Sequence, residues 1–152
     1  MMNSSNVSVL SVGPVDEHQT ALGEILRRSE WAASTDPGGR LACCSGLEGA
    51  IRALRSQRVP VVLCDDKVDW RQLLEHLREL PDAPFLIVTS RLADDRLWSE
   101  ALNLGAYDVL AKPFDANEVT RVLTMAWNRW LERSTRCFRR THGQQLTQAS
   151  YA

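Results

Sequence analysis

The stretch from Val59 to Asp66, VPVVLCDD, most constrains what this chain can fold into. Six almost wholly apolar residues are followed at once by two carboxylates. A short apolar run without polar alternation is typical of a strand that is covered on both faces, in the middle of a parallel sheet. In such sheets, chemistry lies just beyond the carboxyl ends of the strands. We therefore expect Asp65 to lie at the functional edge of a sheet.

Strand-like and helix-like segments alternate along the rest of the chain. Four further strands are predicted, at 7–12, 40–44, 85–89 and 108–111. Helices are predicted after the strands: from about 16, from 45, over 69–80, up to Gly105 and from 115. The alternation predicts an α/β fold, a doubly wound five-stranded parallel sheet, (βα)5, with helices on both faces and right-handed crossovers.

Local signals mark the ends of these elements. Ser45 with Glu48, and Asp115 with Glu118, have the spacing of a capping box at a helix start. Gly105 suits a helix C-terminus, and DPGG at 36–39 predicts a turn.

Composition limits the class of protein. With 152 residues, 44% hydrophobic and 24% charged, the chain predicts one globular domain. Cys43, Cys44, Cys64 and Cys137 lack the CxxC spacing of a metal or redox site, so we expect reduced thiols. The chain has neither a signal-peptide pattern nor an apolar run of membrane-spanning length, which favours a cytoplasmic location and no membrane contact.

Polar residues follow three successive predicted strands. Asp65 ends the third, Thr89 ends the fourth, and Lys112-Pro113-Phe114 follows the fifth, at the end of the segment LNLGAYDVLAKPF. With these residues the chain resembles the receiver domain of two-component response regulators, over about residues 7–131. The resemblance implies a flavodoxin-like fold with strand order 2-1-3-4-5.

The resemblance also implies roles for these side chains. It implies that Asp65 is the candidate phosphoacceptor, to which a histidine kinase or phosphotransfer protein transfers a phosphoryl group. It implies that Lys112 contacts the phosphoryl oxygens and that the Thr89 hydroxyl reports phosphorylation. A carboxylate is a competent nucleophile, and phosphoryl transfer depends mainly on positioning and positive charge.

The chain departs from the family's pattern where Mg²⁺ would bind. Two adjacent acids usually follow the first strand, but Gly13 and Pro14 occupy these positions. Asp16 and Glu17 should lie a turn too far along the chain. Because Mg²⁺ requires near-octahedral oxygen ligands, Asp65 alone predicts a poor metal site.

Two other positions differ as well. Lys67, two residues after Asp65, carries an ammonium group that we expect to fold onto Asp65 in place of the missing cation. The aromatic switch position of the fifth strand holds Val109, although Tyr107 lies nearby in the sequence.

The surface of the last two helices is a candidate interface. Trp130 fits the buried stripe of the last helix, whereas Trp127 and Leu131 are offset from it, and Trp98 lies on the preceding helix. We expect an output partner, or a homodimer through the fourth helix, fifth strand and fifth helix. The alternative is that the extended last helix covers these side chains.

The C-terminal segment differs in charge from the rest. Five arginines and one acid from Arg129 onward give +4, so the preceding part carries −5 of the total of −1. We expect a receiver-like domain with an extended last helix over 1–133 and a basic, then polar, partly disordered tail over 134–152, although the helix could continue as far as Arg140. Nineteen residues follow Arg133, too few for a DNA-binding domain.

Two functions remain open. The first is a stand-alone receiver-like signalling domain that is phosphorylated on Asp65. The second is a phosphorylation-independent pseudo-receiver that acts by protein contact or dimerisation. An enzyme is not expected, because the sequence has no GxGxxG or Walker motif. We expect His18, His76 and His142 to lie on helix surfaces or in the tail.

Overall fold

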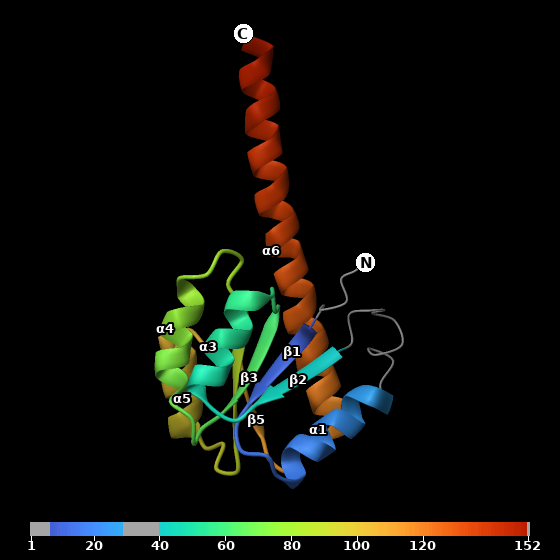
Figure 1. The fold of residues 1–152 in the computed structure, drawn as a ribbon, viewed down its shortest axis with the longest axis vertical. Coiled ribbons are helices and arrows are strands. Elements are labelled where there is room, and N and C mark those ends of the chain that lie inside the picture. The colour runs from blue at the N-terminus through green and yellow to red at the C-terminus, as the bar shows by residue number, and fades with distance from the viewer. Residues whose placement is uncertain (1–6, 29–39, 152) are drawn as a thin grey trace.

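A computed structural model describes residues 7–28 and 40–151, with side chains over 9–28 and 41–133. The DPGG turn predicted at 36–39 lies outside these residues. The strands form one parallel sheet in the order β2-β1-β3-β4-β5 (Figure 1). They are β1 (Val7–Val12), β2 (Arg40–Cys44), β3 (Val61–Asp65), β4 (Phe85–Ser90) and β5 (Asp108–Ala111). The predicted fold class and strand order are therefore confirmed.

Helices cover both faces of the sheet. They are α1 (Glu17–Arg28), α3 (Leu47–Ser56), α4 (Trp70–Arg78), α5 (Asp95–Leu104) and α6 (Ala116–Tyr151). Side chains of α1 and α6 share one apolar cluster, and those of α3, α4 and α5 share the other. The sheet is thus the middle layer of three (Figure 1).

The central strand β3 supplies side chains to both clusters. Val61 and Leu63 join the cluster of α1 and α6, while Val62 and Cys64 join the other. Because side chains alternate along a strand, Asp65 lies on the side of α1 and α6. Its register partner on β4 is Thr89, so these two side chains lie side by side.

Aspartates begin four helices; Asp16 begins α1 and accepts a hydrogen bond from the backbone N–H of Gln19 at 3.2 Å. Asp69, Asp94 and Asp115 each accept a hydrogen bond from the backbone N–H three residues on, at 3.2, 3.0 and 3.0 Å. Gly105 ends α5 with φ of 111°, a conformation that favours glycine.

The capping box predicted for Ser45 and Glu48 is wrong. The N-cap of α3 is Gly46, and no side chain caps the helix. The helix begins one residue later than the box requires, so Glu48 is not at the third helical position.

Helix α6 is a single helix of 36 residues, about 54 Å long at 1.5 Å per residue. Its C-terminal part projects away from the sheet and its helices (Figure 1). The backbone is helical up to Tyr151. A domain boundary at residue 133 stays a prediction.

In the part of the chain that the structure describes, no helix is both long and apolar enough to cross a bilayer.

Candidate functional site

Asp65 and Lys112 form a buried ion pair at the carboxyl edge of the sheet. Asp65 is the last residue of β3, and Lys112 follows β5, where the Lys112–Pro113 peptide bond is cis. The Lys112 ammonium donates to Asp65 Oδ2, and the two side chains are 8% and 6% exposed. Removing either partner would leave the other charge with little access to water.

The second carboxylate oxygen of Asp65 is also bound. The backbone N–H of Lys67 donates to Oδ1 at 2.8 Å. Burial by itself raises the pKa of Asp65, but the hydrogen bonds from Lys112 and Lys67 outweigh it and hold the pKa below its ordinary value of 3.8. Hydrogen bonds from the protein therefore stabilise the Asp65 carboxylate in its charged form, although it is buried.

Lys67 does not act as the sequence suggested. Its contact with Asp65 is through the backbone amide, and its side chain is exposed. Among the described residues, the ion pair of Asp65 is with Lys112 rather than with the Lys67 ammonium.

Thr89 and Asp66 complete the edge. Thr89 is 4% exposed and lines a cavity of about 10 Å³ together with Asp65 and Lys112, room for about one water molecule. Asp66 is exposed, and its Oδ2 accepts a hydrogen bond from Ser90 Oγ at 2.7 Å. Asp65, Thr89 and Lys112, which the sequence assigned to the site, therefore lie together. Asp66 instead binds Ser90, the last residue of β4.

Gly13 packs directly on Asp65. A Cβ added at Gly13 would lie 2.8 Å from Asp65 Cβ, closer than real Cβ contacts. The first position of the missing acidic pair is thus too close to Asp65 for any side chain, unless the end of β1 moves. Pro14, at the second position, has no oxygen on its side chain.

The nearby acids are used elsewhere. Asp16 Oδ1 accepts from the backbone N–H groups of His18 and Gln19, at 3.0 and 3.2 Å, and so caps α1. Burial raises the pKa of Asp16, but these amides outweigh it and lower the value overall. Glu17 is exposed and pairs with Arg91 at 3.5 Å.

These residues do not fit Mg²⁺. Both carboxylate oxygens of Asp65 already have protein partners. The residues beside Asp65 add no free carboxylate, because Gly13 and Pro14 have no side-chain oxygen and the Asp16 carboxylate caps α1. Among the described residues, no group of three or more His, Cys, Asp or Glu side chains could hold a metal ion. Mg²⁺ needs about six oxygens in near-octahedral geometry, which this edge does not supply.

His18 is a residue that the sequence analysis misplaced. It is 9% exposed rather than on the helix surface, and it lines the small cavity beside Asp65 and Thr89. Its Nε2 is buried with no hydrogen-bond partner, and its ring meets Phe114 edge-on at 6.4 Å. The signal was its place four residues before buried Leu22 on α1, on the same helix face.

Neither Val109 nor the neighbouring Tyr107 places an aromatic ring at this edge. Val109 is 4% exposed within the cluster of α3, α4 and α5. Tyr107 packs on Phe85 at the other end of the sheet, with ring centres 5.2 Å apart. An aromatic switch beside Thr89 is therefore not built from Tyr107.

The three predicted interface residues lie on two sides of the sheet. Trp98, on α5, is 40% exposed, and Leu131, on α6, is 39% exposed. Trp127 is half-buried and stacks on Trp130, with ring centres 6.2 Å apart. Trp98 and Leu131 are accessible to a partner, whereas Trp127 partly contributes to the core.

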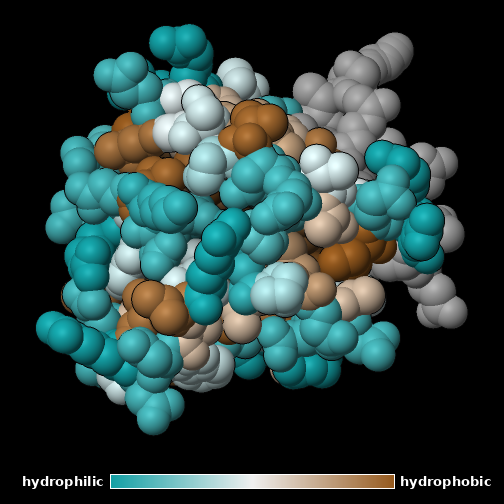
Figure 2. Space-filling model, turned by 90° about the horizontal axis from the view of Figure 1, so that it is seen from below, coloured by the Kyte–Doolittle hydropathy of each residue, from teal (hydrophilic) through white to brown (hydrophobic). Residues whose placement is uncertain are grey.

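Seen from below, the side at which the strands end, the surface is mainly hydrophilic with small separate hydrophobic areas (Figure 2). Val15 and Leu92, on the loops after β1 and β4, are 85% and 77% exposed.

Comparison with known proteins decides the family. Residues 15–124 match the response regulator receiver domain family. The chain belongs to this family. Receiver domains are typically non-catalytic signalling modules of two-component systems, and they commonly bind Mg²⁺ at the phosphorylation site. In this receiver domain, the match begins immediately after Gly13 and Pro14.

Relatives of known sequence support the same family. The chain is 31% identical over 129 residues to the transcriptional regulatory protein ZraR of Klebsiella oxytoca, covering 82% of the chain and 27% of that protein. A protein-glutamate methylesterase/protein-glutamine glutaminase of Desulfotalea psychrophila is 48% identical over 44 residues, covering 28% of the chain and 12% of the relative. The chain thus spans about a quarter or less of these relatives.

Solved structures show the same fold at low sequence identity. A signal receiver domain of an HD domain-containing protein from Pseudomonas fluorescens Pf-5 has a TM-score of 0.71 and 20% identity, covering 90% of this chain and 97% of the other. A CheY-like receiver from Methanospirillum hungatei JF-1 has a TM-score of 0.66 and 15% identity, covering 85% and 99%.

Proposed function

We propose that this receiver domain is a phosphorylation-independent pseudo-receiver, which acts in two-component signalling through protein contacts and not as an enzyme. In this proposal Asp65 and Lys112 form a permanent structural ion pair, and Mg²⁺ takes no part. The proposed location is the cytoplasm.

The observation that carries the proposal is the closure of the metal site. Gly13 lies so close to Asp65 that a Cβ would come within 2.8 Å of it, and both carboxylate oxygens have protein donors. The loops after β1 and β4 also expose the apolar side chains of Val15 and Leu92.

Phosphorylation of Asp65 is the second candidate. Asp65, Thr89 and Lys112 come together at one edge, with the geometry expected for a phosphoacceptor, a hydroxyl and a cation. A histidine kinase or phosphotransfer protein would be the partner in that case. Phosphoryl transfer would then have to proceed with Lys112 as the neutralising charge.

A titration with Mg²⁺ and beryllofluoride, a phosphoryl mimic, separates the two candidates. We would follow the backbone amides of Asp65, Lys67 and Thr89 by ¹H–¹⁵N NMR, in the parent protein and in Asp65→Asn. The proposal predicts no saturable shift up to millimolar Mg²⁺. Asp66→Asn is the matched control, because Asp66 is next to Asp65 in the sequence and its carboxylate accepts a hydrogen bond from Ser90.

Saturable binding that is lost in Asp65→Asn and kept in Asp66→Asn would establish the phosphorylatable site instead. The search for a kinase would follow from that result.

We propose Trp98 on α5 and Leu131 on α6 as the contact residues for an output partner or a second copy, with Trp127 one turn before Leu131 on α6. The receiver domain of NtrC4 was solved as a beryllofluoride-activated dimer, and it shares the fold of this chain with a TM-score of 0.64. Analytical ultracentrifugation of Trp98→Ala and Leu131→Ala tests the homodimer. A sedimentation coefficient equal to that of the parent in both variants would argue against this surface.

A further inference from the structure

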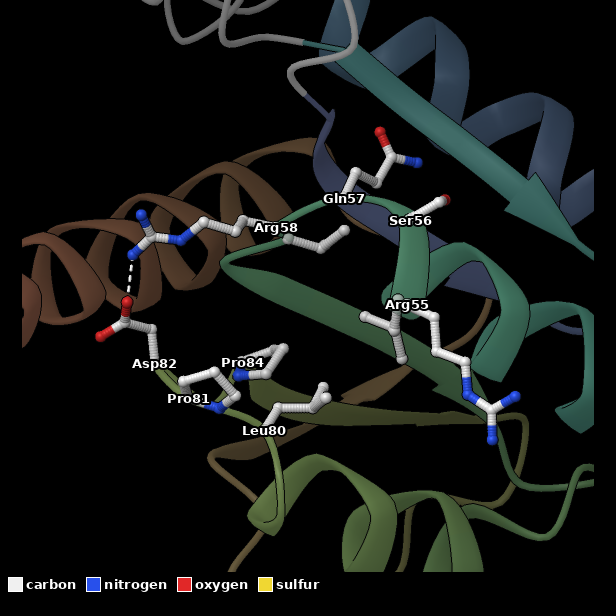
Figure 3. Close-up of a pocket in the computed structure, with 10 residues that line it drawn as sticks. Arg55, Ser56, Gln57, Arg58, Leu80, Pro81, Asp82 and Pro84 are labelled. Carbon is white, nitrogen blue, oxygen red and sulfur yellow. Dashed lines mark hydrogen bonds and ion pairs between the residues drawn. The ribbon is translucent and has the colours of Figure 1, made fainter.

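A cavity lies at the opposite end of the sheet from Asp65. Its volume is about 450 Å³, and it is bounded by the C-terminal end of α3 and the loop that joins α4 to β4 (Figure 3). Val59 and Pro84, which line it, precede β3 and β4, so the cavity lies at the amino ends of the strands. Its size is in the range of small-molecule sites, about 300–1,000 Å³.

The lining combines apolar side chains with two arginines. The apolar residues are Leu54, Val59, Leu80, Pro81 and Pro84. Arg55 and Arg58 extend on different sides of the cavity, with the proline loop along another side (Figure 3). Asp82 is the one carboxylate among the lining residues, so the lining has a formal charge of +1.

The two arginines differ in their partners. Arg58 pairs with the Asp82 carboxylate and lies over the Trp130 ring, 5.4 Å from its centre. Arg55 is exposed, and among the described side chains no acceptor binds it. A guanidinium group has five N–H donors and binds carboxylate or phosphate with two of them at once.

The loop at Asp82 also attaches helix α6. Trp130 Nε1 donates to the backbone oxygen of Asp82 at 3.1 Å. Arg133 donates to the backbone oxygen of Ala83, and its guanidinium lies 4.7 Å from the centre of the Phe85 ring. Arg58 and Asp82 therefore both line the cavity and contact Trp130 of helix α6.

We propose that this cavity binds a small organic anion, an apolar body that carries a carboxylate or a phosphate. The apolar body lies on the leucine and proline side chains, and the anionic group binds Arg58, while the charge of Arg55 attracts the anion from the other side of the cavity. The anion replaces Asp82 as the partner of Arg58, which changes the contact between the loop and Trp130. The binding does not involve Asp65, and it is independent of the proposed function.

The test uses three small-molecule probes and ¹H–¹⁵N NMR. One signal to follow is the indole N–H of Trp130, which is assigned by its loss in the spectrum of Trp130→Phe. Phenyl phosphate and benzoate supply the two anionic groups on the same ring, and benzylamine supplies a cation of similar size. The proposal predicts saturable shifts for residues 54–59 and 80–84 and for the Trp130 indole. These shifts should appear with one or both anions and not with benzylamine.

Variants test the role of the arginines. We expect Arg58→Gln to weaken binding at least tenfold, and Arg55→Gln and Arg58→Lys to have smaller effects. Arg121→Gln is the matched control, because Arg121 lines a different groove, between α1 and α6. Arg58 is 67% exposed, so its replacement should leave the protein folded.

The proposal would be overturned by the absence of saturable shifts with both anions. It would equally be overturned if Arg58→Gln and Arg121→Gln bound the anions alike. Binding of phenyl phosphate alone would assign the site to phosphate esters, and binding of benzoate alone would assign it to carboxylates.

Discussion

The charges of Asp65 and Lys112 balance each other without a third ion. Each has little access to water, and each would need a new partner if the other were removed. Retention of both residues therefore follows from the energetics of the fold, whether or not Asp65 is phosphorylated. A phosphorylated receiver and a pseudo-receiver would both have this Asp65–Lys112 pair. They differ in whether the pair binds Mg²⁺ and a phosphoryl group.

Replacing Lys112 tests how far the pair stabilises the fold. Lys112→Met leaves the Asp65 carboxylate buried with only the Lys67 amide, so we expect a loss of about 3–5 kcal/mol in the free energy of unfolding. Urea denaturation at pH 7 measures it. The double variant Asp65→Asn/Lys112→Met should recover much of the loss, whereas Lys67→Ala should change the free energy by less than about 0.5 kcal/mol. A loss in Lys67→Ala as large as that in Lys112→Met would contradict this account.

Acid should destabilise the protein through the same carboxylate. Because the folded-state pKa of Asp65 lies below 3.8, its contribution to stability is present above that pH and is lost as the pH falls through the folded-state value. Asp16 acts in the same direction. We expect the free energy of unfolding to fall below about pH 4, and to fall less steeply in Asp65→Asn. Urea denaturation at a series of pH values checks this, and equal slopes in the two proteins would refute it.

Gly13 provides a test of the closed metal position. Gly13→Ala places a methyl group against Asp65, and we expect a loss of about 1–3 kcal/mol in the free energy of unfolding. Gly23→Ala is the control, since its nearest side-chain atom, on Leu41, is 3.9 Å away. That change within α1 should stabilise the protein by about 0.5–1 kcal/mol. Thermal denaturation compares the two, and a neutral Gly13→Ala would show that the end of β1 moves easily.

Among the elements, the strands were predictable because their signals are local. Apolar runs ending in Asp65 and Thr89 fix β3 and β4, and period-two alternation then assigns each side chain to a face. The start of α3 was not predictable from Ser45 and Glu48, because a capping box depends on the residue at which the helix begins. Two starts one residue apart are compatible with that sequence.

Helix caps give the prediction at this scale. Asp94→Ala removes an acceptor that binds the N–H of Leu97 at 3.0 Å, so we expect a loss of about 1 kcal/mol. Ser45→Ala should change the free energy of unfolding by less than about 0.5 kcal/mol, since α3 has no side-chain cap. Urea denaturation of both variants decides whether the capping box is present. An equal loss in the two would restore the cap at Ser45.

For the whole molecule, the sequence predicted the layers and the group of Asp65, Thr89 and Lys112, because strand ends meet at one edge of a parallel sheet. It did not predict that Gly13 packs against Asp65 or that His18 is buried beside it. Both depend on how closely β1 and α1 approach β3, which is a matter of three-dimensional packing rather than of periodicity. The attachment of α6 through Trp130 and Arg133 was unpredictable for the same reason.

The length of α6 that the domain requires is the last prediction. Trp130, 8% exposed, and Arg133 make the helix's described contacts with the loop before β4. Deleting residues 134–152 should therefore lower the free energy of unfolding by less than about 0.5 kcal/mol. Deleting residues 130–152 also removes Trp130 and should cost about 3–5 kcal/mol. Urea denaturation followed by circular dichroism compares both with the full chain. A large loss on the shorter deletion would place the boundary of the domain beyond residue 133, and would mean that the projecting part of α6 stabilises the fold.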